Sequence, residues 1–400
     1  MKEIVEYSYI NSKFYGKKLS PYIDNFRKNS NHEILPFTTK DELRSCKLDD
    51  LISTSYKEIV RVHSSSGTTG NPVIAAYTQN DIDDWLIMLK RMYDLIGISS
   101  DDIVHITPSY GMWTAGIGFQ MGAESVGALV VPVGSGNTQN HIEYMDKFKP
   151  TTIVATSSYG LTLARIIDTE CIAIKDSLKY GIFGSEIWNK NIKKSIEKKL
   201  GIKAFETYGL TEIYGPGIAI SCSEGEGMHY WNDFIFCEII DPITTKVLNE
   251  GEIGELVITT LKKEGMPLLR YRTGDLTYIT YEACKCGCKY PKIGTILGRV
   301  DDTVKFRGVQ ISPAIIEQAL KKINILYKKF QLHIYEENFK EMANLYVEST
   351  NRYGIKSIEI DIKKMMNVNI NVKFVDEKFF NKNLRKHKYI LDERAKNSEL

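Results

Sequence analysis

The sequence predicts an α/β protein in two parts. A large N-terminal α/β domain includes a β-rich subdomain, and a small α+β domain follows at the C-terminal end. Two observations lead to this prediction. Between about residues 100 and 200, short apolar runs alternate with longer stretches at helical spacing, which is typical of parallel βαβ units covered on both faces. From about residue 217 strand-like runs joined by turns predominate, and after residue 308 helices and strands mix again.

The N-terminal elements follow this pattern in order. The first sixty residues form an irregular, helix-rich segment in which Pro21 and Pro36 interrupt the periodicity. Buried strands are expected at residues 102–107, 128–133, 152–155 and 180–183. Helices are expected between them, at residues 141–148, 160–168 and 187–200.

The remaining elements define the subdomain and the second domain. In the β-rich subdomain we expect strands at residues 234–241, 254–260 and 276–280, with turns at 249–251 and 263–265. In the C-terminal part we expect helices at 313–322 and 355–366, and strands at 331–335, 345–347 and 368–375. The predicted domains are therefore residues 1–300 and 301–400.

Composition narrows the class of protein. The 400 residues are 43% hydrophobic, and 52 Lys and Arg nearly balance 50 Asp and Glu, for a net charge of +2. That balance gives no reason to expect nucleic acid or an anionic membrane as a partner. No stretch resembles a signal peptide or a membrane span, and seven unevenly placed cysteines do not form a disulfide framework. We expect a soluble, cytoplasmic protein, and its size favours an enzyme.

The strongest local motif is the segment from Val62 to Pro72, which reads Val-His-Ser-Ser-Ser-Gly-Thr-Thr-Gly-Asn-Pro. Its hydroxyl and glycine residues leave a run of N–H donors open to a polyphosphate. It is not a Walker A motif, because no Gly-Lys-Ser/Thr follows. The alternative is a flexible surface loop.

Three further segments each have a functional and a plain interpretation. In Phe205–Glu212 an apolar strand ends in Tyr208-Gly209, and Thr211 with Glu212 could hold Mg²⁺ and a phosphate or simply cap a helix. In Leu269–Leu276 an Asp follows a Gly turn, with two Arg just before the turn, so the Asp could bind ribose or join a surface ion pair. Leu297–Gly308 lies where the pattern changes, which is typical of a linker.

Taken together, these strings resemble the adenylate-forming superfamily of acyl-CoA synthetases and peptide-synthetase adenylation domains, and most closely the phenylacetate–CoA ligase family. The resemblance covers nearly the whole chain. Besides the four segments above, it rests on these strings: Pro36-Phe-Thr-Thr-Lys40, Tyr110-Gly111, Gly122-Ala-Glu124, Gly181-Ile-Phe-Gly-Ser-Glu186, Gly215-Pro-Gly217 and Met266-Pro267.

The resemblance implies an adenylate-forming enzyme fold and a role for each matching residue. Such enzymes condense a carboxylate with Mg·ATP to an acyl-adenylate and then pass the acyl group to a thiol. Thr211 would contact the α-phosphate, Glu212 would hold Mg²⁺, and Asp301 would be the hinge of a moving lid. The rest of the nucleotide site would comprise a phosphate cradle (Ser65, Ser66, Gly67, Thr68, Thr69, Gly70), an adenine site (Gly184, Ser185, Glu186, Tyr208, Gly209) and a ribose pair (Asp275, Arg299).

The resemblance also implies a catalytic lysine on the lid, where a cation would stabilise charge on the phosphate oxygens. Lys386 is the best match, although Arg385 stands in place of the usual Gly and Lys388 is a rival. A second departure is Asn71, which replaces the lysine that normally ends the phosphate loop and so removes a charged contact.

The acyl pocket departs from close relatives as well. Tyr110, Gly111, Met112, Trp113 and Tyr159, together with Ser185, are expected to border it. Met112-Trp113 and Ile187 stand where relatives carry other residues, so phenylacetate itself is in doubt. Each aromatic residue could equally belong to the core.

A cysteine cluster suggests a structural metal. Cys284-Lys-Cys286-Gly-Cys288 is dense for an intracellular chain, and Cys222 and His229 lie upstream, so four ligands for tetrahedral Zn²⁺ are at hand. Similar strings recur in relatives of the resembled family, some of which look zinc-bearing. We predict Cys222, His229, Cys284 and Cys286 as the ligands, with Cys288 as an alternative to one of the last two. The other interpretation is a set of reduced thiols on a turn.

These observations predict an acid–thiol ligase that uses ATP, Mg²⁺ and an aromatic or arylacetic acid, with CoA as the favoured acceptor. One alternative is an adenylation enzyme that loads the phosphopantetheine of a carrier protein or forms an amide. Another, of a different class, is a degenerate nucleotide-binding protein. The sequence leaves the acid, the acceptor, and the choice between a monomer and a homodimer open.

Overall fold

The computed structural model describes two compact units. One comprises Met1–Thr273 with Thr277–Ile296, and the other Gly274–Leu276 with Leu297–Leu400. The described residues are the whole chain except 66–71, 171, 187, 189, 225, 301–303, 308, 312, 324, 338–339, 350–354, 367, 381–388 and 395–400. The predicted domain boundary after residue 300 stays a prediction.

The first unit begins with short helices around a small core of their own. They are α1 (Lys2–Asn11), α2 (Lys13–Leu19), α3 (Ile23–Asn29), η1 (His32–Ile34), α4 (Lys40–Ser45), α5 (Leu48–Leu51) and η2 (Tyr56–Glu58). Local capping explains where several begin. Thr39 and Glu42, for example, form a capping box that starts α4 at Lys40. This segment leads into a hairpin of β1 (Ile59–Ser64) and β2 (Ile74–Thr78).

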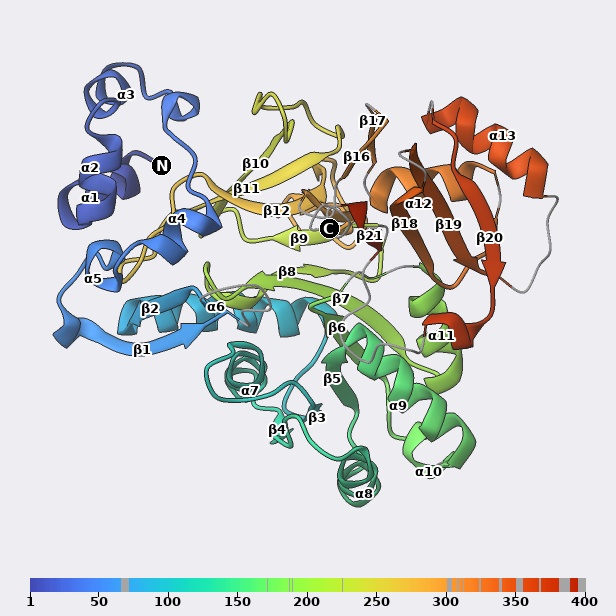
Figure 1. Ribbon diagram of the computed structural model, residues 1–400. Helices are drawn as coiled ribbons and strands as arrows, with labels where there is room; N and C mark the ends of the chain where they lie inside the picture. Colours follow the sequence, from blue (N-terminus) through green and yellow to red (C-terminus); the bar gives the residue numbers. More distant parts are fainter. Residues whose placement is uncertain are drawn as a thin grey trace. The chain divides into compact units, whose positions relative to one another are not determined.

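A nine-stranded sheet dominates the first unit, in the order β13-β14-β9-β8-β7-β6-β5-β3-β4 (Figure 1). Its parallel half contains β3 (Ile103–Ile106), β4 (Leu129–Val131), β5 (Thr152–Thr156), β6 (Tyr180–Gly184) and β7 (Lys203–Leu210). Its antiparallel half contains β8 (Gly215–Ser221), β9 (Met228–Tyr230), β13 (Ile279–Thr280) and β14 (Lys292–Ile293). The strands predicted between residues 100 and 184 are therefore confirmed.

Alternate residues of the parallel strands enter two separate cores, because successive side chains of a strand point to opposite faces. Val154, Ile182 and Phe205 pack with α6 (Gln79–Ile96) and α7 (Ala115–Ser125). Their neighbours Ile153 and Phe183 pack on the other face with α8 (Thr138–Phe148), α9 (Ser157–Glu170), α10 (Ile172–Lys175) and α11 (Lys190–Leu200). Figure 1 shows α9 and α11 side by side on that face. Helices on both faces confirm the predicted α/β class.

The β-rich part is a four-stranded sheet in the order β10-β11-β12-β15. These strands span Ile235–Ile240, Gly254–Thr260, Tyr271–Thr277 and Gly298–Arg299. The prediction of one strand at residues 276–280 is wrong, because β12 ends at Thr277 and β13 begins at Ile279 in the larger sheet. The Thr277 hydroxyl donates to the Gly294 carbonyl at 2.9 Å where the chain passes between the sheets.

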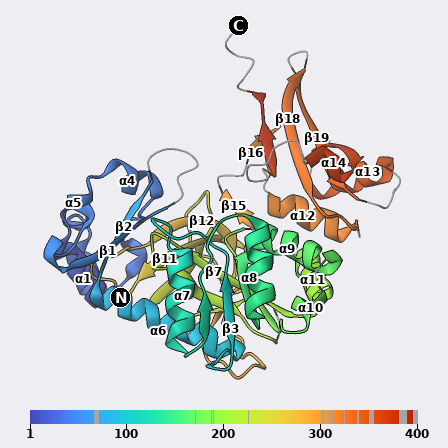
Figure 2. The same cartoon turned by 90° about the horizontal axis from the view of Figure 1, so that it is seen from below.

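The second unit has its own hydrophobic core. A four-stranded sheet in the order β20-β19-β18-β21 packs against α12 (Pro313–Lys322) and α13 (Ile355–Met366), which lie together on one face (Figure 2). The other elements are β16 (Val304–Phe306), β17 (Val309–Ile311), β18 (Phe330–Glu337), β19 (Lys340–Glu348), β20 (Asn371–Val375), α14 (Glu377–Phe380) and β21 (Ile390–Asp392). Across the described parts of both units, no helix combines the length and the apolar character needed to cross a membrane.

Candidate functional site

The carboxyl ends of β5, β6 and β7 meet at one edge of the large sheet. Thr156 is level with Gly184, and Gly184 is level with Thr207. The predicted adenine-site residues, which follow Phe183 and Thr207, therefore come together at this edge. Ligands of open α/β sheets bind at the carboxyl ends of parallel strands, so the position suits a nucleotide.

Two of these residues have a clear local role. Glu186 accepts hydrogen bonds from the Ser158 N–H at 2.7 Å and the Ser158 hydroxyl at 2.9 Å, at the start of α9. Ser185 adopts a left-handed conformation with φ of 67°. A side chain in that region is strained, and such strain gathers at functional sites.

Backbone crowding explains the glycine of the Tyr208-Gly209 string. A Cβ atom at Gly209 would lie 1.9 Å from the carbonyl oxygen of Gly215 on β8. The glycine therefore lets β7 and β8 approach closely at the bulge in their pairing.

Thr211 and Glu212 follow this bulge and are both buried. The Thr211 hydroxyl lies 3.2 Å from that of Thr114, and the Glu212 Oε1 atom lies 2.9 Å from Lys40 Nζ. That oxygen forms no hydrogen bond with any described residue, because the ammonium group approaches it outside hydrogen-bond geometry. A hydroxyl and a carboxylate with spare lone pairs are hard oxygen donors of the kind Mg²⁺ prefers. The pair thus fits the predicted role.

The phosphate loop is held at its two ends. The Ser65 N–H donates to the Val73 carbonyl at 2.9 Å, and the Val73 N–H donates to the Ser65 hydroxyl at 3.0 Å. Next to them, the Ser64 N–H donates to the Met112 carbonyl at 2.8 Å. The other predicted cradle residues, Ser66, Gly67, Thr68, Thr69 and Gly70, lie outside the described residues, as does Asn71.

The predicted acyl-site residues divide between the two faces of the sheet. Tyr110 and Trp113 pack against the core beside α6 and α7, whereas Tyr159 packs against the core beside α8 and α9. Burial raises the pKa of Tyr110 to about 12. Met112, after Gly111, is 48% exposed. That Tyr159 borders one acyl pocket with Tyr110 and Trp113 stays a prediction.

The predicted ribose pair lies in the second unit. Asp275 on β12 is level with Arg299 on β15, and the guanidinium donates to the carboxylate at 2.9 Å. The alternative interpretation of this segment, a surface ion pair, concerned Asp275, which is buried and pairs with Arg299. Arg270 is buried, binds Glu238 at 3.0 Å and donates to the carbonyls of Glu33 and Leu35. The predicted hinge Asp301 and the lysines Lys386 and Lys388 lie outside the described residues.

Four predicted metal ligands come together in the first unit. The ligand atoms of Cys222, His229, Cys284 and Cys286 all lie within 4.8 Å of one another. Two sulfurs, of Cys222 and Cys284, are 3.6 Å apart, and Cys286 Sγ is 3.3 Å from His229 Nε2. Zn–S bonds of about 2.3 Å in a tetrahedron place sulfurs about 3.8 Å apart, so the cluster fits zinc with little movement.

A hydrogen bond orients the histidine of this cluster. His229 Nδ1 lies 2.6 Å from the Tyr290 carbonyl, which leaves Nε2 facing the sulfurs. Such a bond to the second ring nitrogen is typical of metal-binding histidines. Cys288 is not among the four atoms that converge; its N–H donates to Cys286 Sγ.

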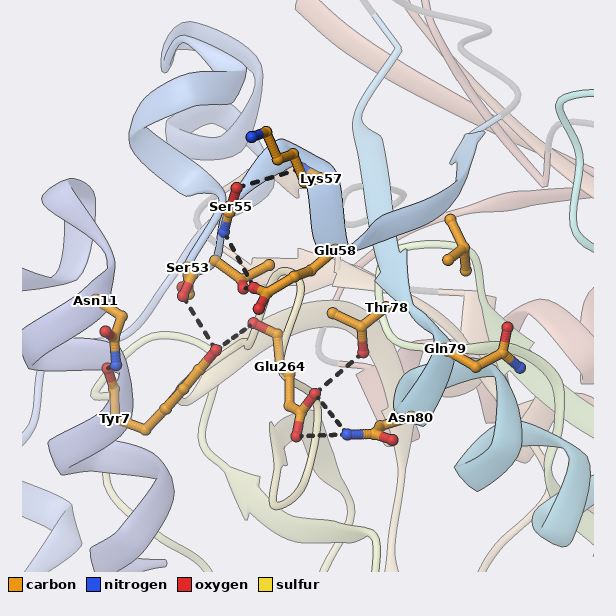
Figure 3. Close-up of a pocket in the computed structure, with 12 residues that line it drawn as sticks. Tyr7, Asn11, Ser53, Ser55, Lys57, Glu58, Thr78, Gln79, Asn80 and Glu264 are labelled. Carbon is orange, nitrogen blue, oxygen red and sulfur yellow. Dashed lines mark hydrogen bonds between the residues drawn. The ribbon is translucent and has the colours of Figure 1, made fainter.

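A cavity of about 910 Å³ lies elsewhere in the first unit (Figure 3). The carboxylates of Glu58 and Glu264 line it, but both already serve the local fold. Glu58 caps the turn at Ser55, and Glu264 accepts from Thr78 and Asn80. None of the described residues predicted for the nucleotide or metal sites lines this cavity.

Sequence reasoning missed two lysines at the Thr211–Glu212 segment. Lys40 belongs to the Pro36–Lys40 string, which contributed to the resemblance but received no role. Lys263 was taken as part of an ordinary turn, yet it is fully buried and donates to the main chain of Glu212. A lysine beside Glu and Gly gives no local sign of burial.

Comparisons with known proteins agree with this geometry. Residues 27–261 match the family described as AMP-binding enzyme, and residues 308–394 match the AMP-binding enzyme C-terminal domain. The chain is 39% identical over 353 residues to phenylacetate-coenzyme A ligase of Thermus thermophilus, covering 87% of this chain and 79% of the relative. It is 36% identical over 354 residues to the Escherichia coli protein of that name, covering 87% and 80%.

A solved structure of 2-hydroxyisobutyryl-CoA ligase, in complex with an adenylate, superposes with a TM-score of 0.81. The alignment covers 98% of this chain and 88% of that one, at 23% identity. At this identity the likeness shows a shared fold, that of adenylate-forming ligases, and confirms the fold expected from the sequence.

Proposed function

This chain belongs to the AMP-binding enzymes, and on that premise we propose that it activates an aromatic or arylacetic carboxylic acid with ATP and transfers the acyl group to coenzyme A. In the first step a carboxylate oxygen attacks the α-phosphorus of ATP, and pyrophosphate leaves with the electron pair of the broken P–O bond. In the second step the thiolate of CoA attacks the acyl carbon, and AMP leaves with the electron pair of the C–O bond.

One observation carries the proposal: the adenine-site strings and the Thr211–Glu212 pair lie at or just beyond the same edge of the sheet. We assign Thr211 to the α-phosphate and Glu212 to Mg²⁺. A bound Mg²⁺ would offset the charge of the phosphate oxygens. Lys386 on the C-terminal unit would supply a second cation at the α-phosphate, and Asp301 would act as the hinge that brings it there.

The substrate class and the acceptor rest on the curated relatives, which are named phenylacetate-coenzyme A ligases. One more distant relative, 26% identical over 234 residues, is named indoleacetate–lysine synthetase and so joins its acid to an amine. A carrier-protein or amine acceptor is therefore the alternative within the enzymes. Since ATP and CoA are cytoplasmic substrates, we place the reaction in the cytoplasm.

Acid-dependent exchange of pyrophosphate into ATP tests the proposal. The assay uses a panel of aryl, arylacetic and alkyl acids with Mg²⁺ and without CoA, and we expect exchange with arylacetic or aromatic acids. Glu212→Gln should reduce it by about 100-fold, because a neutral amide is a weaker ligand for the metal. Binding of ATP without exchange for any acid would instead identify a degenerate nucleotide-binding protein.

We also propose that Cys222, His229, Cys284 and Cys286 bind a structural Zn²⁺. Two observations support this site: the four ligand atoms converge, and a hydrogen bond between His229 Nδ1 and the Tyr290 carbonyl orients the imidazole ring. Zinc in such a site stabilises the fold and takes no part in the ligase chemistry. The cluster joins β9 to the loop between β13 and β14, so the metal would link two segments about sixty residues apart.

A further inference from the structure

Lys263 is a fully buried lysine next to the residues proposed to bind Mg·ATP. It follows β11, and its relative exposure is 0%. Lysines are almost never fully buried unless their charge is paired. Here the ammonium group donates to two main-chain carbonyl oxygens, that of Glu212 at 3.4 Å and that of Ile213.

A second buried side chain completes this arrangement. The Tyr77 hydroxyl, on β2, lies 2.9 Å from the carbonyl oxygens of both Thr211 and Tyr214 and shares its proton between them. Lys263 and Tyr77 therefore bind all four carbonyls of the segment 211–214. The two side chains also touch, because the ammonium lies 4.1 Å from the centre of the Tyr77 ring.

The segment 211–214 is the turn of the β7–β8 hairpin, between Leu210 and Gly215. Leu210 pairs with Gly215, and the Ile213 N–H donates to the Leu210 carbonyl at 3.1 Å. The contacts from Lys263 and Tyr77 add to this turn, because they bind its carbonyl oxygens from elements outside the hairpin.

We propose that Lys263 is a positioning residue for adenylation, whose charged ammonium group fixes the main chain of Glu212 and Ile213 so that Thr211 and Glu212 face Mg·ATP. This inference rests on the function proposed above. It assigns no contact with the substrate to Lys263. Its effect passes through the two residues that make that contact.

The test compares the full-length wild type with Lys263→Met and with Lys262→Met, the neighbouring lysine as a control. For each protein, pyrophosphate exchange and the affinity for Mg·ATP are measured at pH 7, at a temperature below the unfolding transition recorded for that protein. We expect folded Lys263→Met to lose about 100-fold in exchange and to bind Mg·ATP more weakly than the wild type. Lys262→Met should keep the exchange activity and the Mg·ATP affinity of the wild type.

The possible results separate the two proposals. If folded Lys263→Met retains exchange and Mg·ATP affinity within about threefold of the wild type, the role of Lys263 is refuted. If the wild type exchanges with no acid, the proposed function fails, and the Mg·ATP affinity of Lys263→Met relative to the wild type still decides the role of Lys263. Should Lys263→Met not fold, Tyr77→Phe replaces it; removal of that hydroxyl alone must then weaken Mg·ATP binding.

Discussion

Glu212 is a buried carboxylate with a lysine on each side, and the two lysines act on different atoms. Lys263 binds the main-chain carbonyl, whereas Lys40 lies 2.9 Å from the carboxylate itself. Glu212 is 2% exposed, so removal of Lys40 would leave its charge poorly compensated. The Lys40 side chain is 35% exposed, so solvent screening reduces the free energy that would be lost with this ion pair.

We therefore expect Lys40→Met to lower stability by about 1–2 kcal/mol without nucleotide, which is a few degrees in melting temperature. Saturating Mg·ATP should narrow this difference, because Mg²⁺ then neutralises Glu212. Thermal denaturation with and without Mg·ATP checks both parts, with the exposed Lys47→Met as control. A difference of the same size in both conditions would argue that Glu212 does not receive the metal.

At the scale of residues, the sequence located the site by strings whose chemistry is local. Tyr208–Glu212 is readable because a strand, a glycine and two oxygen donors follow one another. The four proposed zinc ligands are readable because sulfur and imidazole side chains occur together in few contexts. Lys263 could not be found this way. Its burial depends on Tyr77 and on the 211–214 segment, which are some fifty or more positions away along the chain.

Strand β7 leads to the proposed nucleotide site, and it also contains a buried carboxyl group that makes stability depend on pH. Glu206 lies in its middle and is 6% exposed; its carboxylate accepts from the Thr295 hydroxyl at 3.2 Å. Burial raises the pKa of Glu206 to about 8, and the Thr295 hydrogen bond and the Lys193 charge oppose this shift only in part. The native state therefore keeps a proton on Glu206 at neutral pH.

The sign of the pH effect follows from this shift. Between the ordinary pKa of 4.5 and about 8, the folded state holds a proton that the unfolded state has lost, so stability falls as the pH rises. Glu206→Gln removes this dependence. We expect the free energy of unfolding of the variant to increase relative to that of the wild type as the pH rises from 5 to 8, by up to about 4 kcal/mol. Denaturant unfolding at several pH values measures the gain, and parallel curves for the two proteins would contradict it.

The elements that the sequence predicted well are those in which hydrophobic residues follow a clear pattern. The apolar runs of the parallel strands and the amphipathic helix at 355–366 were placed almost to the residue. The two-residue strands β13 and β14 were not predicted, because they are defined only by their pairing: β13 pairs with β14, and β14 pairs with β9. A segment of two residues has no detectable period, so only the tertiary fold specifies it.

At the scale of the whole molecule, the chain contains two units with separate hydrophobic cores. The core of the second unit is built from residues between Phe306 and Ile390, and the zinc cluster lies wholly in the first unit. All four tryptophans, at positions 85, 113, 188 and 231, also belong to the first unit. Tryptophan fluorescence therefore reports on one unit, whereas far-ultraviolet circular dichroism reports on both.

This division allows the metal to be tested by its effect on one unit alone. Protein purified without chelator should contain about one zinc per chain, because a structural site binds tightly. Removal of the metal, or the substitution Cys284→Ser, should lower the midpoint temperature of the unfolding transition seen by tryptophan fluorescence, since the link between β9 and the 284–286 segment is lost. The unfolding transition of the second unit, which only circular dichroism detects, should keep its midpoint temperature, because no proposed ligand lies in that unit. Cys46→Ser, a cysteine of the first unit outside the cluster, is the matched control and should retain the metal. A zinc content below about half an equivalent, or an equal shift of both transitions, would show that the cluster does not stabilise the first unit through a metal.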